Sequence, residues 1–450
     1  MQKLELTWMG KGEEPKLEPH ILIHDKEKSY GDENTENMLI HGDNLLALKA
    51  LEQDYAGKIK CIYIDPPYNI NVANPNYDDN LPHSEWLSLM QIRLKCLYTL
   101  LSDDGFIFIQ IDDDEHAYLK VLCDEIFGRN NFVNSIAVKM SEASGNKMAH
   151  VDKRLVKIKE NILLYRKTPS LLNAIKIQKD KWDSEYNKVF VNLKREDKAF
   201  IDSVIANNEN SSIESCILKI DEILSSLEVK GINEVMRDEH VDINNNELVD
   251  KWLKENAYRI FRTTASKSVK RLADEKKKMT DNTYFSVISV RDKKIYIVKS
   301  DYQQTSSSPR VQVLFAEDYL STYIGDLWVD IATTGLEAEG GVDFKNSKKP
   351  EKLIERIIKL GSSEGDLILD SFLGSGTTAA VAHKMGRKWI GIELGYHCYT
   401  HCKPRLERVI DGEDMGGITR AVDWKGGGGF KFYELAPSLL KKDKASICDL

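Results

Sequence analysis

Two short motifs, far apart in the chain, place chemically capable residues at the ends of apolar runs. The first is Asp65-Pro66-Pro67-Tyr68, which follows the apolar run 59–64. Two consecutive prolines keep the backbone extended and remove two N–H donors, so carbonyls and the Asp65 carboxylate remain as acceptors. A carboxylate and a carbonyl can accept both hydrogens of an exocyclic amine, and Tyr68 can stack on a flipped base. The motif predicts a site that activates a base amino group; alone, it also fits a rigid loop.

The second motif is a glycine turn after an apolar run that ends at Asp370. Gly374 and Gly376 let the backbone approach a ligand, and Thr377 opens a helical pattern. The next apolar run ends at Glu393, whose carboxylate can accept hydrogen bonds from ribose hydroxyls. No lysine follows the glycines and the full G-x-G-x-x-G pattern is absent, which disfavours phosphate ligands. A nucleoside without phosphates, such as S-adenosylmethionine, fits better, although an ordinary tight turn remains the alternative for the glycines alone.

Apolar runs and helical spacings alternate around both motifs. Such β-α-β-α alternation is the signature of a parallel sheet wrapped by helices, so we expect an α/β fold. A turn is expected at 103–105. The expected strands are 38–40, 59–64, 106–111, 133–138, 161–165, 367–369, 388–392 and 430–433, and the expected helices include 84–101, 115–127, 351–360, 377–385 and 396–409.

The alternation stops near Lys167 and resumes by Pro350, in a chain long enough for about two to three domains. The stretch between mixes helical, polar and short strand segments, with a low-complexity turn at 305–309. The simplest organisation is one α/β domain in two sequence pieces with a second domain inserted. We predict an N-terminal arm at 1–37, a first catalytic part at 38–167, an α+β target-recognition insert at 168–330 and a second catalytic part at 331–450.

With both motifs in this order, the chain resembles beta-class amino-group DNA methyltransferases, in which the catalytic motif precedes the cofactor motif. The resemblance implies a Rossmann-like, S-adenosylmethionine-dependent methyltransferase sheet with circularly permuted motif order. It also implies adenine N6 methylation by base flipping and direct transfer, because the tetrapeptide begins with Asp65, whereas cytosine N4 enzymes more often carry Ser. A cytosine-N4 or RNA-base methyltransferase and a non-catalytic DNA-binding subunit remain alternatives. The implied catalytic residues are Asp65, Pro66, Pro67 and Tyr68.

The resemblance covers further segments. The segment 41–45 is similar to one whose Asp contacts the cofactor adenine, and 346–350 resembles a motif that helps hold the methionine moiety. The segment 105–113 is similar to the strand beside the active site. The implied cofactor-binding residues are Asp43, Asp65, Lys349, Asp370, Phe372, Gly374, Gly376, Thr377 and Glu393.

Three stretches, 107–115, 258–263 and 423–430, resemble the modification subunits of type III restriction-modification systems. Those subunits dimerise and pair with a helicase-nuclease. The implied partners are therefore duplex DNA, a second copy of the chain and a restriction subunit. This chain is shorter than most such subunits, chiefly in the recognition region, so a stand-alone methyltransferase is the close alternative.

Charge is distributed unevenly. The net charge of −8 argues against blanket affinity for nucleic acid, but basic segments at 139–198 and 251–310 flank an acidic one at 199–250. The densest basic run predicts phosphate contacts, with a solvated helix face as the alternative. Its candidate DNA-binding residues are Arg259, Arg262, Lys267, Lys270 and Arg271.

Other features narrow the protein class. The 7 cysteines are odd in number and scattered, which indicates a reduced protein rather than a disulfide framework. We therefore expect a cytoplasmic, bacterial protein without a leader peptide or membrane span. The His and Cys residues of 397–402 lie on one helical stretch that is poorly suited to a tetrahedral ion, so no metal is expected.

Overall fold

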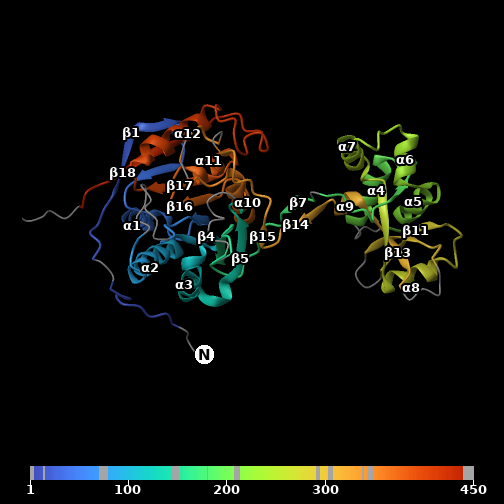
Figure 1. Ribbon diagram of the computed structural model, residues 1–450, viewed down its shortest axis with the longest axis horizontal. Coiled ribbons are helices and arrows are strands. Elements are labelled where there is room, and N and C mark those ends of the chain that lie inside the picture. Colours follow the sequence, from blue (N-terminus) through green and yellow to red (C-terminus); the bar gives the residue numbers. More distant parts are fainter. Residues whose placement is uncertain are drawn as a thin grey trace, which may run out of the picture. The chain divides into compact units, whose positions relative to one another are not determined.

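The computed structural model describes residues 5–13, 16–69, 80–143, 152–153, 155–179, 181–206, 213–289, 294–302, 308–336, 339–342, 344 and 348–438. The chain forms two compact units (Figure 1). The first comprises Met1–Ile175 and Ile324–Leu450, and the second comprises Lys176–Tyr323. The second unit falls inside the stretch 168–330 that we assign to target recognition; that role stays a prediction.

The first unit contains a ten-stranded mixed sheet. All pairings from β18 to β4 are parallel, whereas β6 runs antiparallel to both β4 and β5, and β1 runs antiparallel to β18. The α/β, Rossmann-like class is confirmed, but an entirely parallel sheet is not what forms. In spatial order the strands are β1 (Leu22–Gly31), β18 (Gly429–Leu435), β2 (Met38–His41), β17 (Lys388–Glu393), β16 (Leu367–Asp370), β3 (Ile59–Ile64), β4 (Leu101–Ile111), β6 (Lys159–Arg166), β5 (Phe132–Lys139) and β15 (Leu327–Trp328).

Helices cover both faces of this sheet, because successive strand side chains point to opposite sides. Cys61 and Tyr63 of β3 pack in the core with α10 (Glu351–Gly361), α11 (Thr377–Lys384) and α12 (Lys403–Ile410). Ile62 and Ile64 pack in the opposite core with α1 (Asn44–Tyr55), α2 (His83–Leu100) and α3 (Asp113–Cys123) (Figure 1). In the part of the chain that the structure describes, no helix is long and apolar enough to cross a membrane.

Three local predictions differ from the structure. Residues 22–31 of the predicted arm form β1, because they pair with β18 at the sheet edge. The turn predicted at 103–105 lies inside β4, where the register shifts between Leu101 and Phe106; the extra residues form a bulge instead of ending the strand. The helix predicted at 396–409 begins with a π-helical turn, η5 (Cys398–Cys402), before α12. Most of the turn predicted at 305–309 lies outside the described residues.

The second unit is an α+β structure. Its antiparallel sheet runs in the order β11 (Tyr284–Ile288), β12 (Ile295–Lys299), β13 (Arg310–Phe315), β10 (Ile260–Ala265), β8 (Lys188–Phe190) and β9 (Val229–Gly231). The ladder of β7 (Lys176–Gln178) and β14 (Ser321–Tyr323) brings together the two ends of the unit. The helices are α4 (Arg195–Ala206), α5 (Ile213–Ser225), α6 (Ile232–Asp238), α7 (Asn246–Asn256), α8 (Lys267–Lys276) and α9 (Ala316–Tyr319).

Candidate active site at the carboxyl edge of the sheet

Both sequence motifs lie at one edge of the main sheet. Asp65 directly follows β3, and Asp370 is the last residue of β16, its parallel neighbour. Glu393 ends β17, the next parallel strand, and Asp43 follows β2 beyond it. Carboxyl ends of adjacent parallel strands meet at the same edge, which is where open α/β sheets bind ligands. The fold therefore assembles the predicted catalytic and cofactor motifs side by side.

The Asp65 carboxylate is held by two groups. The Tyr68 hydroxyl donates to Asp65 Oδ1 at 2.7 Å, and Lys349 Nζ lies 2.8 Å from Asp65 Oδ2. Lys349 also donates to the Tyr68 hydroxyl at 2.9 Å, and its ammonium lies 5.0 Å from the centre of the Tyr68 ring. Lys349, from the motif before α10, thus contacts the predicted catalytic tetrapeptide directly. Asn346 and Ser347 of that motif lie outside the described residues.

Glu160, which was not among the predicted site residues, completes this cluster. Its Oε2 accepts hydrogen bonds from the Tyr68 hydroxyl at 2.7 Å and from Gln110 Nε2 at 2.5 Å, and lies 3.6 Å from Lys349 Nζ. Because β6 is antiparallel, its first residues lie at the edge where β3 and β4 end. The sequence signal that could have indicated Glu160 is an acidic residue at the start of an otherwise apolar strand.

Burial and charge pull the pKa values of this cluster in different directions. Burial raises the pKa of Asp65, and the nearby Lys349 only partly offsets this. Burial also opposes ionisation of Glu160, but Lys349 and the Gln110 hydrogen bond bring its pKa below the usual value. Burial alone would lower the pKa of Lys349, yet the Asp65 and Glu160 carboxylates raise it. Lys349 is therefore held as an ammonium beside two carboxyl groups.

The backbone of the tetrapeptide is anchored from both sides. The indole N–H of Trp86 donates to the Pro67 carbonyl at 2.8 Å. Pro66 is buried, and Asn69 then takes a left-handed conformation with φ of 56°. The Asn69 amide donates to Glu115 Oε1 at 2.9 Å and its oxygen accepts from the N–H of Leu81. The loop that carries Asp65 is thus rigidly attached to α2 and α3.

The glycine turn is shaped by Asp370. Its Oδ1 accepts from the N–H of Phe372 at 2.9 Å, and its Oδ2 accepts from the Thr378 hydroxyl at 2.6 Å. Burial raises the pKa of Asp370 to about 7 despite these hydrogen bonds. Gly374 and Gly376 both have positive φ, 59° and 81°, which a residue with a side chain adopts only under strain.

Two further predicted cofactor residues already have protein partners. The Asp43 Oδ1 caps α1 by accepting from the N–H groups of Leu45 and Leu46, at 2.9 and 3.1 Å. The Thr377 hydroxyl accepts a hydrogen bond from Arg405 at 2.7 Å. Cofactor binding by Asp43 and Thr377 stays a prediction.

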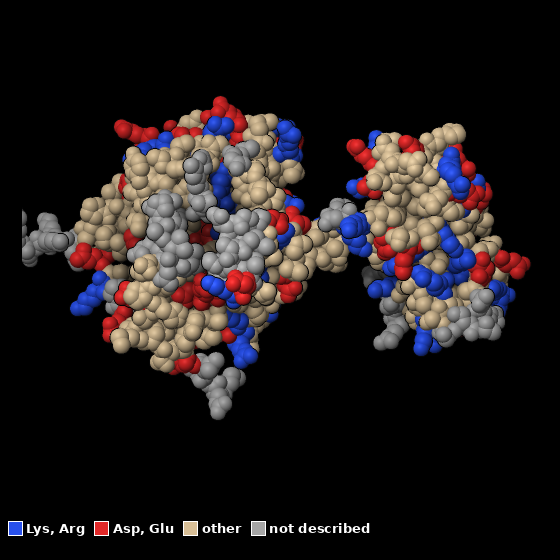
Figure 2. Space-filling model, in the orientation of Figure 1, with Lys and Arg blue, Asp and Glu red and all other residues tan. Residues whose placement is uncertain are grey.

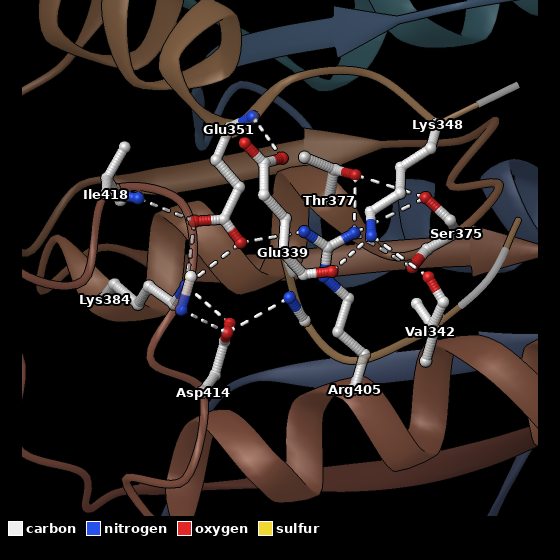
Figure 3. A network of polar contacts seen from close by, with 12 residues as sticks. Glu339, Val342, Lys348, Glu351, Ser375, Thr377, Lys384, Arg405, Asp414 and Ile418 are labelled. Atoms are coloured by element: carbon white, nitrogen blue, oxygen red, sulfur yellow. Dashed lines mark hydrogen bonds and ion pairs between the residues drawn. The ribbon is translucent and has the colours of Figure 1, made fainter. Parts of the chain in front are cut away.

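A buried ionic network stands behind the glycine turn (Figure 3). Lys384 lies 2.8 Å from Glu351 and 2.6 Å from Asp414, and Arg405 lies 2.8 Å from Glu351. The four side chains are at most 1% exposed. Lys348 meanwhile donates to backbone carbonyls of the preceding loop. Since Lys348 and Glu351 flank Lys349 and Pro350, the network fixes the segment that presents Lys349 to Asp65.

In the second unit, the predicted DNA-binding residues divide into two groups. Arg259 is buried and donates to Glu239 at 2.7 Å and to the Val191 carbonyl at 3.0 Å, so it supports the unit itself. Arg262 and Lys270 pair with neighbouring carboxylates, whereas Lys267 and Arg271 of α8 are exposed. Figure 2 shows Lys and Arg side chains gathered over the part of this unit that carries β13 and α8, interspersed with acidic ones.

A family model described as DNA methylase matches residues 59–403, which include both motifs. The chain belongs to the DNA methylase family. The chain is 36% identical over 422 residues to the "Probable type III restriction-modification enzyme HindVI Mod subunit" of Haemophilus influenzae, covering 89% of this chain and 54% of that protein. It is 29% identical to the type III EcoPI Mod subunit of Escherichia phage P1, covering 85% of this chain and 61% of that protein. The chain thus spans between half and two thirds of the length of these relatives.

Among solved structures, PvuII DNA methyltransferase (cytosine-N4-specific) matches 87% of this chain and 92% of its own chain, with 13% identity and a TM-score of 0.40.

Proposed function

We propose that this DNA methylase transfers a methyl group from S-adenosylmethionine to adenine N6 at specific sites in duplex DNA. The observation that carries the proposal is the placement of Asp65 after β3 beside the glycine turn after β16, on adjacent parallel strands. An amine-activating group and a cofactor turn thereby share one edge. The similarity to type III Mod subunits supports a role in a restriction-modification or other DNA-modification system.

The residues present fit a cationic nucleoside cofactor. The left-handed turn at Gly374 and Gly376 presents backbone without side chains. Glu393 places a carboxylate where ribose hydroxyls would bind, and Asp43 and Phe372 lie near the same edge. Asp65 and Glu160 add negative charge, which suits a sulfonium. When bound, S-adenosylmethionine supplies an electrophilic methyl group.

The catalytic work falls on the tetrapeptide. Asp65 and the Pro66 carbonyl accept the two N–H bonds of the flipped adenine amine and orient its lone pair. Tyr68 stacks on the base. N6 would take the methyl group as the methyl–sulfur bond breaks and neutral S-adenosylhomocysteine leaves. Asp65 would stabilise the positive charge that develops on N6 and accept its departing proton. Positioning and electrostatic stabilisation supply most of the rate enhancement.

The proposal extends to partners. By similarity to the Mod subunits, we propose a homodimer and a restriction subunit as protein partners. Because the substrate is duplex DNA, the protein would work in the bacterial cytoplasm. Size-exclusion chromatography with light scattering tests the dimer, since a stable monomer at micromolar concentration contradicts it.

The decisive experiment incubates the full chain with isotopically labelled S-adenosylmethionine and duplex DNA of diverse sequence, and then analyses the nucleosides. We expect labelled N6-methyladenine, and we expect Asp65→Asn to lower the rate of its formation by a factor of at least about 10². Labelled N4-methylcytosine would assign the enzyme to cytosine instead. Cofactor binding without any labelled nucleoside, on DNA or RNA, would indicate a subunit that binds without catalysing.

A further inference from the structure

We propose that Glu160 is a positioning residue of the active site, which holds Lys349 and the Tyr68 hydroxyl against Asp65 and gives the cluster a net negative charge. The inference rests on the proposed methyl transfer and deepens it. Glu160 lies on β6, outside both sequence motifs. It acts through the residues that meet the substrates, not by touching the reacting atoms itself.

The Tyr68 hydroxyl and the Lys349 ammonium have a limited number of hydrogens to donate. The Tyr68 hydroxyl has one hydrogen but lies 2.7 Å from both Asp65 and Glu160. Lys349 has three, of which one points to Asp65 and one to the Tyr68 oxygen, with Glu160 3.6 Å away. Both groups are therefore shared between two carboxylates. Without Glu160, Asp65 would be the one carboxylate of this cluster that interacts with the Tyr68 hydroxyl and the Lys349 ammonium.

The Glu160 side chain is itself anchored. Gln110 of β4 donates to Glu160 through Nε2, while its Oε1 accepts from the Tyr63 hydroxyl of β3 at 2.7 Å. Gln110 is fully buried and Tyr63 nearly so. Three neighbouring strands thus hold the Glu160 carboxylate in place, as a group that orients others must be held.

Lys349 is constrained by residues next to it in the sequence. Lys348 is tied to carbonyls of the preceding loop, and Glu351 enters the buried network with Lys384 and Arg405 (Figure 3). The backbone of Lys349 is therefore fixed on both sides. The groups that face its ammonium, which are the Asp65 and Glu160 carboxylates and Tyr68, then set where that ammonium lies.

Glu160 also changes the net charge of the cluster. Two carboxylates and one ammonium leave a net charge of minus one, whereas Asp65 with Lys349 alone would be neutral. Methyl transfer from a sulfonium to an amine carries one positive charge through the site at every stage. A largely buried negative charge attracts that cation far more strongly than one in water would. Glu160 thus selects for the charged methyl donor over its neutral product.

Glu160 also affects the ionisation of Asp65. The groups that face its carboxyl are Lys349, Glu160, Tyr68, Tyr63 and Asp370. Among them the Glu160 charge raises the pKa of Asp65, in the same direction as burial. Replacing Glu160 with a neutral residue should therefore lower the pH at which Asp65 becomes the ionised acceptor.

The first test measures charge selectivity by calorimetry on the full chain. Its two probes are S-adenosylmethionine and S-adenosylhomocysteine, which lacks the methyl group and the positive sulfur. We expect Glu160→Gln to weaken binding of the cation about tenfold more than binding of the neutral ligand. Equal weakening of the two ligands overturns the proposal. Glu52→Gln, in the last turn of α1, is the matched control and should leave both affinities unchanged.

The second test is the pH profile of methyl transfer. Glu160→Gln should lower kcat and move the acidic limb to lower pH, whereas Glu160→Asp, which keeps the charge, should leave the limb near its original position. A limb that does not move in Glu160→Gln overturns the proposal. If Glu160→Gln does not fold, a second variant, Gln110→Met, removes the donor behind Glu160. It should change the ligand selectivity in the same direction but to a smaller extent.

These readouts separate the inference from the proposed function. A wild-type chain that prefers the cationic ligand, and loses that preference in Glu160→Gln, supports the role of Glu160 even if no adenine is methylated. Absence of adenine methylation alone refutes the proposed function. A wild-type chain that binds neither ligand overturns both.

Discussion

The backbone N–H of Gly374 donates a 2.7 Å hydrogen bond to the carboxylate of Glu393. The other carboxylate oxygen accepts from the N–H of Gly395 at 2.9 Å and lies 2.9 Å from His397 Nε2. Glu393 therefore connects the end of β17 to the glycine turn after β16. A carboxylate has about four acceptor positions, so these three contacts orient Glu393 and leave about one position for a ribose hydroxyl.

We accordingly predict that Glu393→Ala weakens S-adenosylmethionine binding by at least about tenfold, because the variant loses the ribose acceptor and the bond that shapes the turn. Calorimetry gives the affinity, and thermal unfolding shows whether the fold is kept. Glu355→Ala, whose side chain pairs with Lys359 on α10, is the control. An unchanged affinity in a folded Glu393→Ala chain would contradict the assignment.

The glycine turn offers a comparison of matched variants. Gly376 and Gly365 have almost the same φ, 81° and 83°, but an added Cβ would lie 3.3 Å from Cys402 Cα at Gly376 and would meet nothing within 4 Å at Gly365. We expect each Gly→Ala variant to lose about 1–2 kcal/mol of unfolding free energy through backbone strain. Only Gly376→Ala should also weaken cofactor binding. Equal cofactor affinities in the two variants would remove Gly376 from the site.

The sequence predicted that Asp65 and the glycine turn would meet, because both follow apolar runs in repeated βα units and parallel strands end at one edge. It did not predict Glu160. The placement of that residue depends on β6 pairing antiparallel with β4, and strand direction is a long-range property that the apolar run alone does not determine.

The direction of the Thr377 side chain could not be predicted from the sequence either. Thr377 adjoins the glycines in sequence, yet the first turn of α11 points its hydroxyl toward the buried Arg405. No local sequence pattern indicates that Thr377 pairs with a residue so far along the chain. Asp43, in contrast, precedes an amphipathic helical pattern, and Asp before such a pattern is a known N-cap signal that could have been recognised.

The raised pKa of Asp370 predicts a pH dependence of stability. Burial brings this pKa from 3.8 to about 7, so between these values the folded chain holds a proton that the unfolded chain has released. The contribution of Asp370 to stability is therefore complete at low pH and declines as the pH rises toward 7.

Asp370→Asn stays neutral and keeps groups that can pair with Phe372 and Thr378. Relative to wild type, its free energy of unfolding should therefore rise between about pH 5 and about pH 7, by at most about 1.4 kcal/mol per pH unit. Urea unfolding at the two pH values measures this difference. A difference between variant and wild type that does not change with pH would contradict the protonated state of Asp370.

In the second unit, the basic residues expected to contact DNA differ from the one that supports the fold. Lys267 and Arg271 are exposed on α8, so Lys267→Ala and Arg271→Ala should each weaken duplex binding for all sequences and lower the salt dependence by about one phosphate contact. Arg259→Ala should instead lower stability by about 1–3 kcal/mol, because it removes hydrogen bonds to Glu239 and Val191. Fluorescence anisotropy across salt concentrations and urea unfolding distinguish these effects. If the α8 variants bind DNA with an unchanged salt slope, the phosphate contacts of this unit lie elsewhere on its surface.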